Sequence, residues 1–371
     1  MRVAAIVPYH TQFCAGQRFR IELWAAHLRG RGIEVEFYPF ASPALTSVLY
    51  APGQLARKAA HMLACYADQL RRVVSAKGRP DAVYIYREAA LVGPAFIERL
   101  VRRWHVPVIY DIDEPLFVPY VSPSNGHLNR LKFFSKVNKL FEMSDHVLAV
   151  NRVIADYAAG YARRVSIVPM AVDTERYKPA PEGDEAEARD GEPALVGWVG
   201  TLTNQPNLEL IAAPLRRLSE THSVALRVIA DEPVALEGVD VEFIKWSFGE
   251  EVGRLRECQI GVVPVRESVW GPWKFFFKLI QYMSLGMPVV ASAIGSNLEI
   301  IEDGVNGFLA RDDDEWHERL RALLDDADLR RRMGRAARAT AVEHFSLDGQ
   351  IDFVERVFRE APALLAAGGR A

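Results

Sequence analysis

The strongest constraint on the fold of this chain is a regular alternation of short apolar runs with longer amphipathic stretches. In the first half the apolar runs stand at residues 3–9, 34–38, 82–86, 108–110 and 146–150. The run at 3–9 is continuous, as is typical of a strand that is buried on both faces of a parallel sheet. The stretches between the runs, such as 18–29, have the pattern of helices. The sequence therefore predicts an α/β fold in which helices connect parallel strands.

A polar segment divides this pattern into two halves. Residues 178–193 read KPAPEGDEAEARDGEP, with many acids and almost no large apolar side chain, as expected of a linker. Apolar runs then resume at 194–199, 225–229, 241–244, 260–265, 289–292 and 307–310. We therefore expect two Rossmann-like, doubly wound parallel-sheet domains, 1–180 and 181–371, with a helix at about 346–366 that packs back on the first. Ligands of such sheets bind beyond the carboxyl ends of the strands, which favours a cleft between the domains as the site.

Composition excludes several classes of protein. The chain has 371 residues, of which 50% are hydrophobic and 25% charged, enough for an apolar core in each domain. Its formal net charge is -3, so no overall basic field indicates a nucleic-acid partner. The fingerprints GxGxxG and GxxxxGK[ST] are absent, which argues against a dehydrogenase and a P-loop NTPase.

The cysteines and the apolar segments favour a cytoplasmic protein. Cys14, Cys65 and Cys258 have no metal-ligand spacing, and such isolated cysteines suit a reducing compartment. The first ten residues already contain a proline and a histidine, unlike the apolar core of a signal peptide. No run approaches the roughly 20 apolar residues that span a bilayer.

The densest pattern is the block 278–310, KLIQYMSLGMPVVASAIGSNLEIIEDGVNGFLA. A helix is predicted to end at Gly286, Pro288 opens a buried strand, and Gly295 allows a tight turn whose backbone amides can face a ligand. Together with the two-domain layout, this block resembles the nucleotide-sugar half of the family 4 glycosyltransferases, which have the GT-B fold. Three more stretches agree with that resemblance, 16–22, 168–179 and 197–207.

The resemblance implies a GT-B enzyme with two Rossmann-like domains that face each other across a cleft. The nucleotide diphosphate sugar is then expected on the second domain and the acceptor on the first. The reaction implied is transfer of a hexosyl group to an acceptor hydroxyl with retention at the anomeric carbon and without a metal or other cofactor. The acceptor class stays open among a glycan, a lipid-linked acceptor and a small molecule.

Two departures from the family pattern affect the donor site. Where most members carry two glutamates before the Gly-x-Pro turn, this chain has Trp273 and Gln281. An amide such as that of Gln281 can still bind ribose hydroxyls, whereas Trp273 cannot replace a carboxylate. In the 197–207 stretch, Asn204 and Gln205 stand in place of an Arg and a Lys that would bind the diphosphate.

Lys274 and Lys278 are the candidates to neutralise that diphosphate, since they are four residues apart and share a face if the stretch is helical. The alternative is that both are solvated surface lysines. Trp246 follows the run 241–244, where the family contacts the nucleobase, although a lone Trp is also a common core anchor. The full predicted donor site is Gly16, Gly200, Thr201, Trp246, Lys274, Lys278, Gln281, Gly295, Ser296, Asn297 and Glu299.

In the first half, Gly16 opens the first long helix, where backbone amides can face an anion. Arg18 and Arg20 follow it and are predicted to bind a phosphate on the acceptor, with a solvated surface position as the alternative. Glu114 completes the predicted acceptor-binding set.

Asp113 and Lys278 are the predicted catalytic residues. The strand at 108–110 runs into DIDEPLF, and Asp113 stands where the resemblance implies a histidine beside the transferred sugar. The alternative for Asp113 is a cap on the following loop. A second alternative is a metal site on Asp111 and Asp113, because Asp-x-Asp binds a divalent cation in another glycosyltransferase fold.

Residues 128–143 read as a basic amphipathic helix, with lysines and an arginine interleaved among phenylalanines and other apolar side chains. Such a helix can lie at the inner face of a membrane and bring the enzyme to a lipid-linked acceptor. Alternatively its apolar face belongs to the core of the first domain. Two other functions stay open: a nucleotide-sugar epimerase or phosphorylase on the same fold, and a sugar-nucleotide-binding subunit without catalysis.

Overall fold

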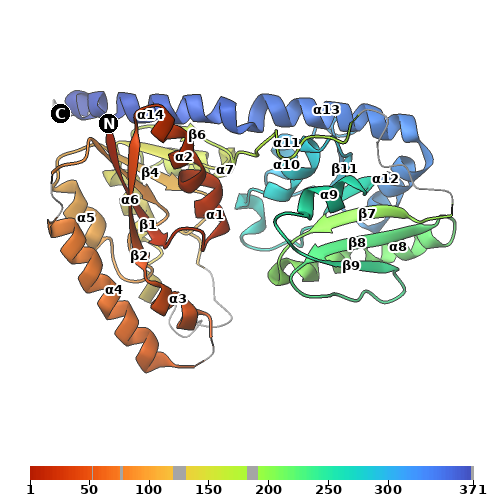
Figure 1. Ribbon diagram of the computed structural model, residues 1–371, viewed down its shortest axis with the longest axis horizontal. Helices are drawn as coiled ribbons and strands as arrows, with labels where there is room; N and C mark the ends of the chain where they lie inside the picture. The colour runs from red at the N-terminus through yellow and green to blue at the C-terminus, as the bar shows by residue number, and fades with distance from the viewer. Residues whose placement is uncertain (52, 76–77, 120–130, 182–190, 369–371) are drawn as a thin grey trace. The chain divides into compact units, whose positions relative to one another are not determined.

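The computed structural model describes residues 1–371 except 52, 76–77, 120–130, 182–190 and 369–371. The chain divides into two compact units (Figure 1): unit 1 is Met1–Met170 with Gln350–Ala371, and unit 2 is Ala171–Gly349. The boundary therefore lies ten residues before the expected one at 180. Tyr177 explains the difference, because its hydroxyl donates to Glu251 and its carbonyl accepts from Arg338, both within unit 2.

Unit 1 contains a six-stranded parallel sheet in the order β2-β1-β3-β4-β5-β6. Its strands are β1 (Arg2–Tyr9), β2 (Glu34–Ala41), β3 (Ala82–Tyr86), β4 (Val108–Ile112), β5 (His146–Ala149) and β6 (Val165–Ile167). Its helices are α1 (Ala15–Gln17), α2 (Leu23–Gly30), α3 (Pro43–Leu49), α4 (Leu55–Ser75), α5 (Phe96–Arg102), α6 (Lys136–Met143), α7 (Arg152–Ala159) and most of α14 (Leu347–Gly368), with a π-helical turn, η1 (Arg18–Glu22), between α1 and α2. The edge strand β6 has only three residues, none of them fully buried, and the sequence did not predict it.

The sheet of unit 1 is buried where the apolar runs predict it. Val3 to Val7 on β1 are at most 2% exposed, because β1 is a central strand and helices pack against the sheet. Helix α14 contributes side chains to the same unit. Trp24 donates from Nε1 to Oε1 of Gln350 at 2.8 Å, and Phe358 packs on Tyr84 with 6.1 Å between the ring centroids.

Unit 2 repeats this architecture with the order β12-β11-β10-β7-β8-β9, again all parallel. Its strands are β7 (Ala194–Val199), β8 (Val224–Ala230), β9 (Val241–Lys245), β10 (Ile260–Val263), β11 (Val289–Ser292) and β12 (Phe308–Ala310). Its helices are α8 (Ala212–Ser219), α9 (Glu251–Arg256), α10 (Phe277–Ser284), α11 (Asn297–Ile300), α12 (Asp313–Asp325) and α13 (Ala327–Phe345), with two 3₁₀ helices, η3 (Leu202–Ile211) and η4 (Gly271–Trp273).

The predicted α/β fold with two doubly wound parallel sheets is thus confirmed. The core of unit 2 includes Trp198 on β7, Leu215 on α8 and Leu320 on α12. In the part of the chain that the structure describes, no helix combines the length and apolar character needed to cross a membrane.

Candidate functional site

The strand order of unit 1 places the topological switch point of the sheet beside the first predicted residues. The chain begins at β1 and continues to β2 on one side and to β3 on the other, so the topological switch point lies between β1 and β3. Doubly wound sheets bind ligands outside the carboxyl ends of the strands at such a point. Gly16 follows β1, Arg87 follows β3, and Asp113 follows β4. These three residues therefore lie at the same edge of the sheet.

Asp113 is held by a guanidinium and a phenol. Arg87 donates from Nε to Oδ1 at 2.6 Å and from Nη2 to Oδ2 at 2.7 Å, and Tyr86 donates from Oη to Oδ2 at 2.6 Å. Asp113 is 2% exposed. Burial opposes its ionisation, but the Arg87 guanidinium outweighs burial and holds the pKa of the carboxyl below its usual range. The carboxylate is therefore ionised at neutral pH and has little capacity left to accept a proton.

Arg87 is a site residue that the sequence prediction missed. Its φ is +58°, a left-handed conformation that is uncommon outside glycine and asparagine. Backbone strain of this kind persists where surrounding contacts fix it, and Arg87 also pairs through Nη1 with Oε2 of Glu114 at 3.1 Å. Its position directly after a buried strand was the only signal in the sequence. We name Gly16, Tyr86, Arg87, Asp113 and Glu114 the Asp113 cluster.

Gly16 belongs to this cluster because its lack of a side chain leaves room for Tyr86, Arg87 and Asp113. A Cβ atom at Gly16 would lie 2.4 Å from Tyr86 Oη, 2.5 Å from Asp113 Oδ2 and 2.8 Å from Arg87 Nη2. Real Cβ atoms do not approach other atoms so closely. Only glycine therefore fits at position 16 while Tyr86, Arg87 and Asp113 keep these places.

The Arg20 guanidinium is bound within the core of unit 1 and is not available to a ligand at this edge of the sheet. Its side chain is fully buried, and it binds both carboxylate oxygens of Asp111 at 2.7 Å as well as the Val168 carbonyl. The predicted helix over 18–29 is distorted at Arg20, whose φ of -115° and ψ of -108° are not helical. The structure thus contradicts both a phosphate-binding and a solvated Arg20. Arg18 is half-buried over the ring of Phe19.

The pairing of both aspartates argues against the Asp-x-Asp metal hypothesis. Asp111 is bound by Arg20 and by the Tyr84 hydroxyl, while Asp113 is bound by Arg87. A cation would have to displace a guanidinium from each carboxylate. Within the described residues, no group of three or more His, Cys, Asp or Glu side chains is arranged to hold a metal ion.

In unit 2 the switch point lies between β7 and β10, and Gly200 and Thr201 directly follow β7. A Cβ at Gly200 would lie 2.4 Å from Cη2 of Trp198, so the chain passes directly over the indole ring. The Lys278 ammonium lies over the same ring, with Nζ 4.3 Å from its centroid. Lys278 is therefore adjacent to the turn that ends β7. Thr201 is exposed, and its Oγ1 accepts a hydrogen bond from Asn204.

The pKa of Lys278 is unusually low for a lysine. Burial and the neighbouring Lys274 charge lower its pKa to about 7. The Trp198 ring is the partner that the structure gives its ammonium, and cation–π contacts offset only part of the cost of removing a cation from water. A lysine with these properties gains strongly when an anion binds beside it. This makes Lys278 the best-supported of the predicted donor-binding residues.

Lys274 and Lys278 do not share one helix face. Helix α10 begins at Phe277, and Lys274 stands in extended conformation after η4. The carbonyl of Lys274 instead accepts from the Ser296 amide at 3.2 Å, and the Phe276 amide donates to Ser296 Oγ at 3.0 Å. These bonds attach the segment 274–276 to the Gly295 turn. The two lysines still lie close enough for their charges to interact.

The Gly295 turn is tightly built. Gly295 has φ of +57°, and a Cβ there would lie 2.6 Å from the Gly271 carbonyl oxygen. The amides of Ser296 and Asn297 donate within the protein, at 3.2 and 3.3 Å. A phosphate at this turn would therefore have to replace these two bonds. Asn297 is buried with its Oδ1 unsatisfied, whereas Glu299 is exposed.

Trp246 and Gln281 are joined by Glu251, which the sequence prediction also missed. The buried Glu251 carboxylate accepts from Trp246 Nε1 at 2.5 Å, from Gln281 Nε2 at 2.8 Å and from the Tyr177 hydroxyl at 2.8 Å. The Gln281 amide nitrogen is thus already in use. A contact of Gln281 with ribose must use its carbonyl oxygen or replace these bonds.

Residues 136–143 form α6 and fit the core alternative for that part of the predicted amphipathic helix. Leu131 and Phe133 instead are 49% and 45% exposed, and 128–130 lie outside the described residues. On α6, Val137, Leu140 and Phe141 are at most 1% exposed. Lys136 is buried too, and its Nζ pairs with Glu88 at 2.7 Å and donates to the Ala90 carbonyl. The apolar face of α6 therefore packs into unit 1 and is not free for a membrane.

Comparison with known proteins agrees with this layout. Residues 193–326 match the family model of glycosyl transferases group 1. D-inositol 3-phosphate glycosyltransferase of Stackebrandtia nassauensis is 27% identical over 213 residues, which are 50% of this chain and 46% of that protein. The chain spans about half the length of the first curated relatives it matches.

Solved structures resemble nearly the whole chain. Sucrose-phosphate synthase from Thermosynechococcus elongatus has a TM-score of 0.74 at 15% identity, and the match covers 99% of this chain and 100% of that one. HepE of Anabaena, solved with UDP-glucose, has a TM-score of 0.66 at 18% identity, with 97% and 100% covered. This chain has the GT-B glycosyltransferase fold.

Within this GT-B glycosyltransferase fold, the predicted residues fall into separate groups. Unit 1 brings together Gly16, Asp113 and Glu114. Unit 2 brings Lys278 to the Gly200 turn and attaches Lys274 to the Gly295 turn. Arg20 belongs to the core of unit 1. The assignment to family 4 and the role of each predicted residue stay predictions.

Proposed function

We propose that this chain is a nucleotide-sugar glycosyltransferase that binds its donor on unit 2 and moves the sugar to an acceptor hydroxyl. The observation that carries the proposal is the position of Lys278, a partly buried lysine with a lowered pKa, beside the Gly200 turn at the switch point of unit 2. That position lies inside the region that matches group 1 glycosyl transferases. The HepE complex with UDP-glucose supports a nucleotide sugar as the donor class.

The chemistry requires stabilisation of a departing diphosphate while positive charge develops on the sugar. A lysine ammonium in a partly buried site does this more effectively than one in water, because the interaction of charges strengthens where water is excluded. Lys278 would bind the diphosphate as the cation, and Lys274 would add a second positive charge. We propose that the reaction needs no metal and retains the anomeric configuration.

We propose that the Asp113 cluster acts by position and charge on the acceptor side. Asp113 is held ionised by Arg87, and a general base works best with a pKa near the working pH. Asp113 is therefore a poor proton acceptor in this arrangement. It would instead fix the position of Arg87, and the group formed by Arg87, Asp113 and Glu114 keeps one net negative charge. Glu114, which is one-third exposed, is the more accessible carboxylate of the cluster.

The acceptor class stays open among a glycan, a lipid-linked molecule and a small molecule. A membrane contact through α6 is not part of the proposal, since its side chains Val137, Leu140 and Phe141 lie in the core. Phosphate binding by Arg20 is likewise excluded because its guanidinium is bound to Asp111.

A thermal-shift screen with sugars of UDP, GDP, dTDP and CMP tests the donor class. A ligand that binds only the folded state raises Tm, and we expect one nucleotide series to do so. The same shift should be lost in Lys278→Ala and kept in Lys139→Ala, a control lysine that is 58% exposed on unit 1. No shift with any of the four series would contradict the proposal.

Turnover with the selected donor then separates the candidate activities. A glycosyltransferase releases nucleoside diphosphate when an acceptor is added, whereas an epimerase converts the donor alone. Saturable binding without release across a panel of glycan, lipid and small-molecule acceptors would favour a non-catalytic subunit.

A further inference from the structure

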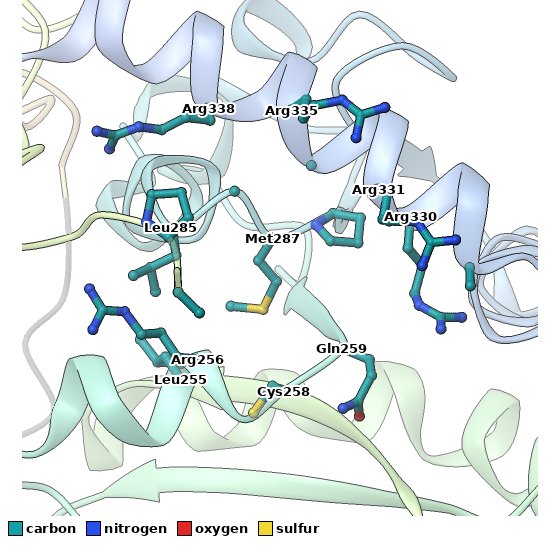
Figure 2. Close-up of a pocket in the computed structure, with 16 residues that line it drawn as sticks. Leu255, Arg256, Cys258, Gln259, Leu285, Met287, Arg330, Arg331, Arg335 and Arg338 are labelled. Atoms are coloured by element: carbon teal, nitrogen blue, oxygen red, sulfur yellow. The ribbon is translucent and has the colours of Figure 1, made fainter. Parts of the chain in front are cut away.

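Unit 2 contains a pocket that is separate from the candidate donor site (Figure 2). It has a volume of about 240 Å³ and lies between the segment 255–259, the turn 285–288 and helix α13. The turn is at the C-terminal end of α10, whereas Lys278 is near its start. Seven residues separate Lys278 from Leu285, which is about 10 Å along a helix axis.

The charged side chains that line the pocket are all positive. None of its sixteen residues is acidic, and five of them are arginines: Arg256, Arg330, Arg331, Arg335 and Arg338. Four of these arginines come from α13. The floor is apolar and includes Leu255, Leu285 and Met287.

Most of these arginines bind groups that satisfy their hydrogen bonds without neutralising their charge. Arg256 donates to the Lys178 carbonyl, Arg330 to the Leu323 and Leu324 carbonyls, and Arg338 to the Tyr177, Thr174 and Ser284 carbonyls. A carbonyl carries no net charge, so these three guanidinium charges remain. Burial also lowers the pKa of Arg338, and the Glu175 charge offsets this only in part.

The remaining two arginines are more accessible to a ligand, although the Asp328 carboxylate interacts with both. Arg331 pairs through Nη2 with Asp328 at 2.7 Å, an ion pair at the surface. Arg335 is exposed. The two follow each other on α13 by four residues and so lie on one face of the helix.

The wall of the pocket is fixed by a close approach of two glycines. A Cβ at Gly334 would lie 2.1 Å from the Gly286 carbonyl oxygen, so α13 contacts the end of α10 directly. Gly286 itself has φ of +69°, the conformation that turns the chain from α10 towards β11. The α13 backbone that carries four of the arginines is therefore fixed at the pocket, so that binding need not order it.

We propose that this pocket binds a small phosphorylated molecule at a site distinct from the donor site. Guanidinium groups bind phosphate oxygens with paired hydrogen bonds, and the uncompensated charges of the lining favour a ligand with two or more negative charges. The volume of about 240 Å³ fits a pyrophosphate or a sugar phosphate, and the apolar floor suits the carbon skeleton of the latter. The inference does not rest on the proposed glycosyltransferase function.

Titration calorimetry of the full chain with inorganic pyrophosphate and with glucose 6-phosphate tests the site. We expect at least one of the two to bind, and the double variant Arg331→Ala/Arg335→Ala to weaken its binding tenfold or more. Lys278→Ala removes the donor-site lysine and should leave this affinity unchanged. Arg332→Ala is the matched control, because Arg332 is exposed on α13 but does not line the pocket.

Three outcomes would overturn the proposal. One is that neither probe binds the wild-type chain, and another is that binding is lost in Lys278→Ala instead of the double variant. The third is equal weakening in Arg332→Ala and the double variant, which indicates general attraction to a basic surface. Unfolding of the double variant is not expected, since an exposed ion pair such as Arg331–Asp328 adds little to stability, and the Tm without ligand checks this.

The acidic stretch 182–190 follows the lining residue Ala180 closely in sequence and lies outside the described residues. Its acids are Glu182, Asp184, Glu185, Glu187 and Asp190. A variant in which these five become Gln or Asn should bind the probe as the wild type does. Binding that arises only in this variant would show that the chain's own carboxylates compete for the arginines, and it would also overturn the proposal.

Discussion

The Arg87 guanidinium donates to both carboxylate oxygens of Asp113, although 26 residues separate the two in the sequence. Arg87 follows β3 and Asp113 follows β4, and the pairing of these two strands brings the residues together. A bidentate pair of this kind fixes the position of both side chains. Any effect of Asp113 on a substrate therefore acts together with Arg87.

A double-mutant cycle tests whether Asp113 and Arg87 act as one unit. We expect Asp113→Asn and Arg87→Ala each to lower turnover per folded molecule about 10²-fold, and the double variant to lose little more than either. Residues that act together are strongly non-additive in this way. Turnover is measured on the soluble, folded fraction, because breaking a mostly buried ion pair also destabilises the protein by about 3 to 5 kcal/mol.

The two single variants also separate positioning from proton transfer. If Asp113 were the general base, its loss alone would reduce turnover by roughly 10² to 10⁴ and remove the acidic limb of the pH–rate profile. The geometry instead predicts that Asp113→Asn keeps the shape of that profile. If the fold-loss of turnover in the double variant equalled the product of the two single fold-losses, the two residues would act independently, which would contradict the coupled role.

Gly16→Ala should damage the Asp113 cluster, because the added methyl meets Tyr86 Oη at 2.4 Å and Asp113 Oδ2 at 2.5 Å. We expect a loss of about 1 to 3 kcal/mol in stability together with lower turnover. Gly30→Ala, at the end of α2, is the control, since a Cβ there meets nothing within 4 Å. Equal Tm and equal turnover in the two variants would show that Gly16 is not close to Asp113.

The sequence predicted every strand except the short edge strand β6, and most clearly those such as β1 and β3 that have a continuous apolar pattern and are buried. The structure of the block 278–310 was equally predictable. Gly286 marks the end of a helix, Pro288 the start of a strand and Gly295 a tight turn. Periodicity reports burial of a segment, and it does so best where a whole strand or helix face is apolar.

Long-range polar pairing was not predictable in the same way. Arg20 looked like a surface residue, and nothing in the local sequence indicates its ion pair with Asp111, 91 residues away. Glu251 likewise depends on Tyr177 and Gln281, which come from distant parts of unit 2. Such partners meet because of the order of the strands in the sheet, and that order cannot be inferred from the local pattern of one sequence.

Arg20→Ala should be one of the most destabilising substitutions in unit 1. It leaves the Asp111 carboxylate buried without its cation, at a cost of about 3 to 5 kcal/mol in the free energy of unfolding. Arg18→Ala is the neighbouring control and should change stability by about 0.5 kcal/mol or less. Urea denaturation measures both. A tolerated Arg20→Ala would mean that Asp111 finds another partner or is protonated.

Activity is expected to survive EDTA, because the proposed charge on the diphosphate is met by Lys278 and Lys274. Asp111 and Asp113 are each occupied by a guanidinium and are not free to bind a cation. The measurement is turnover after chelation and again after adding Mn²⁺. Loss with rescue by Mn²⁺ would contradict the proposal and would require a metal site elsewhere.

The pKa of Lys278 leads to opposite pH effects on donor affinity and on stability. The folded chain holds this pKa at about 7, below the usual 10.5. Donor binding needs the ammonium, so affinity should fall as pH rises above about 7, by up to tenfold per pH unit. Lys274→Ala removes the like charge and should move the onset of this fall to higher pH.

The effect of pH on stability has the opposite sign to its effect on donor affinity. Between pH 7 and 10.5 the unfolded chain binds more protons at this lysine than the folded chain, so the contribution of Lys278 to stability improves as pH rises through that window. Below pH 7 the full cost of the charged, partly buried lysine remains. Lys278→Met should therefore keep or raise Tm at pH 6 while it abolishes donor binding. A lysine retained at a cost to stability is expected where a ligand needs its charge. A lower Tm combined with unchanged donor affinity would instead make Lys278 a purely structural residue.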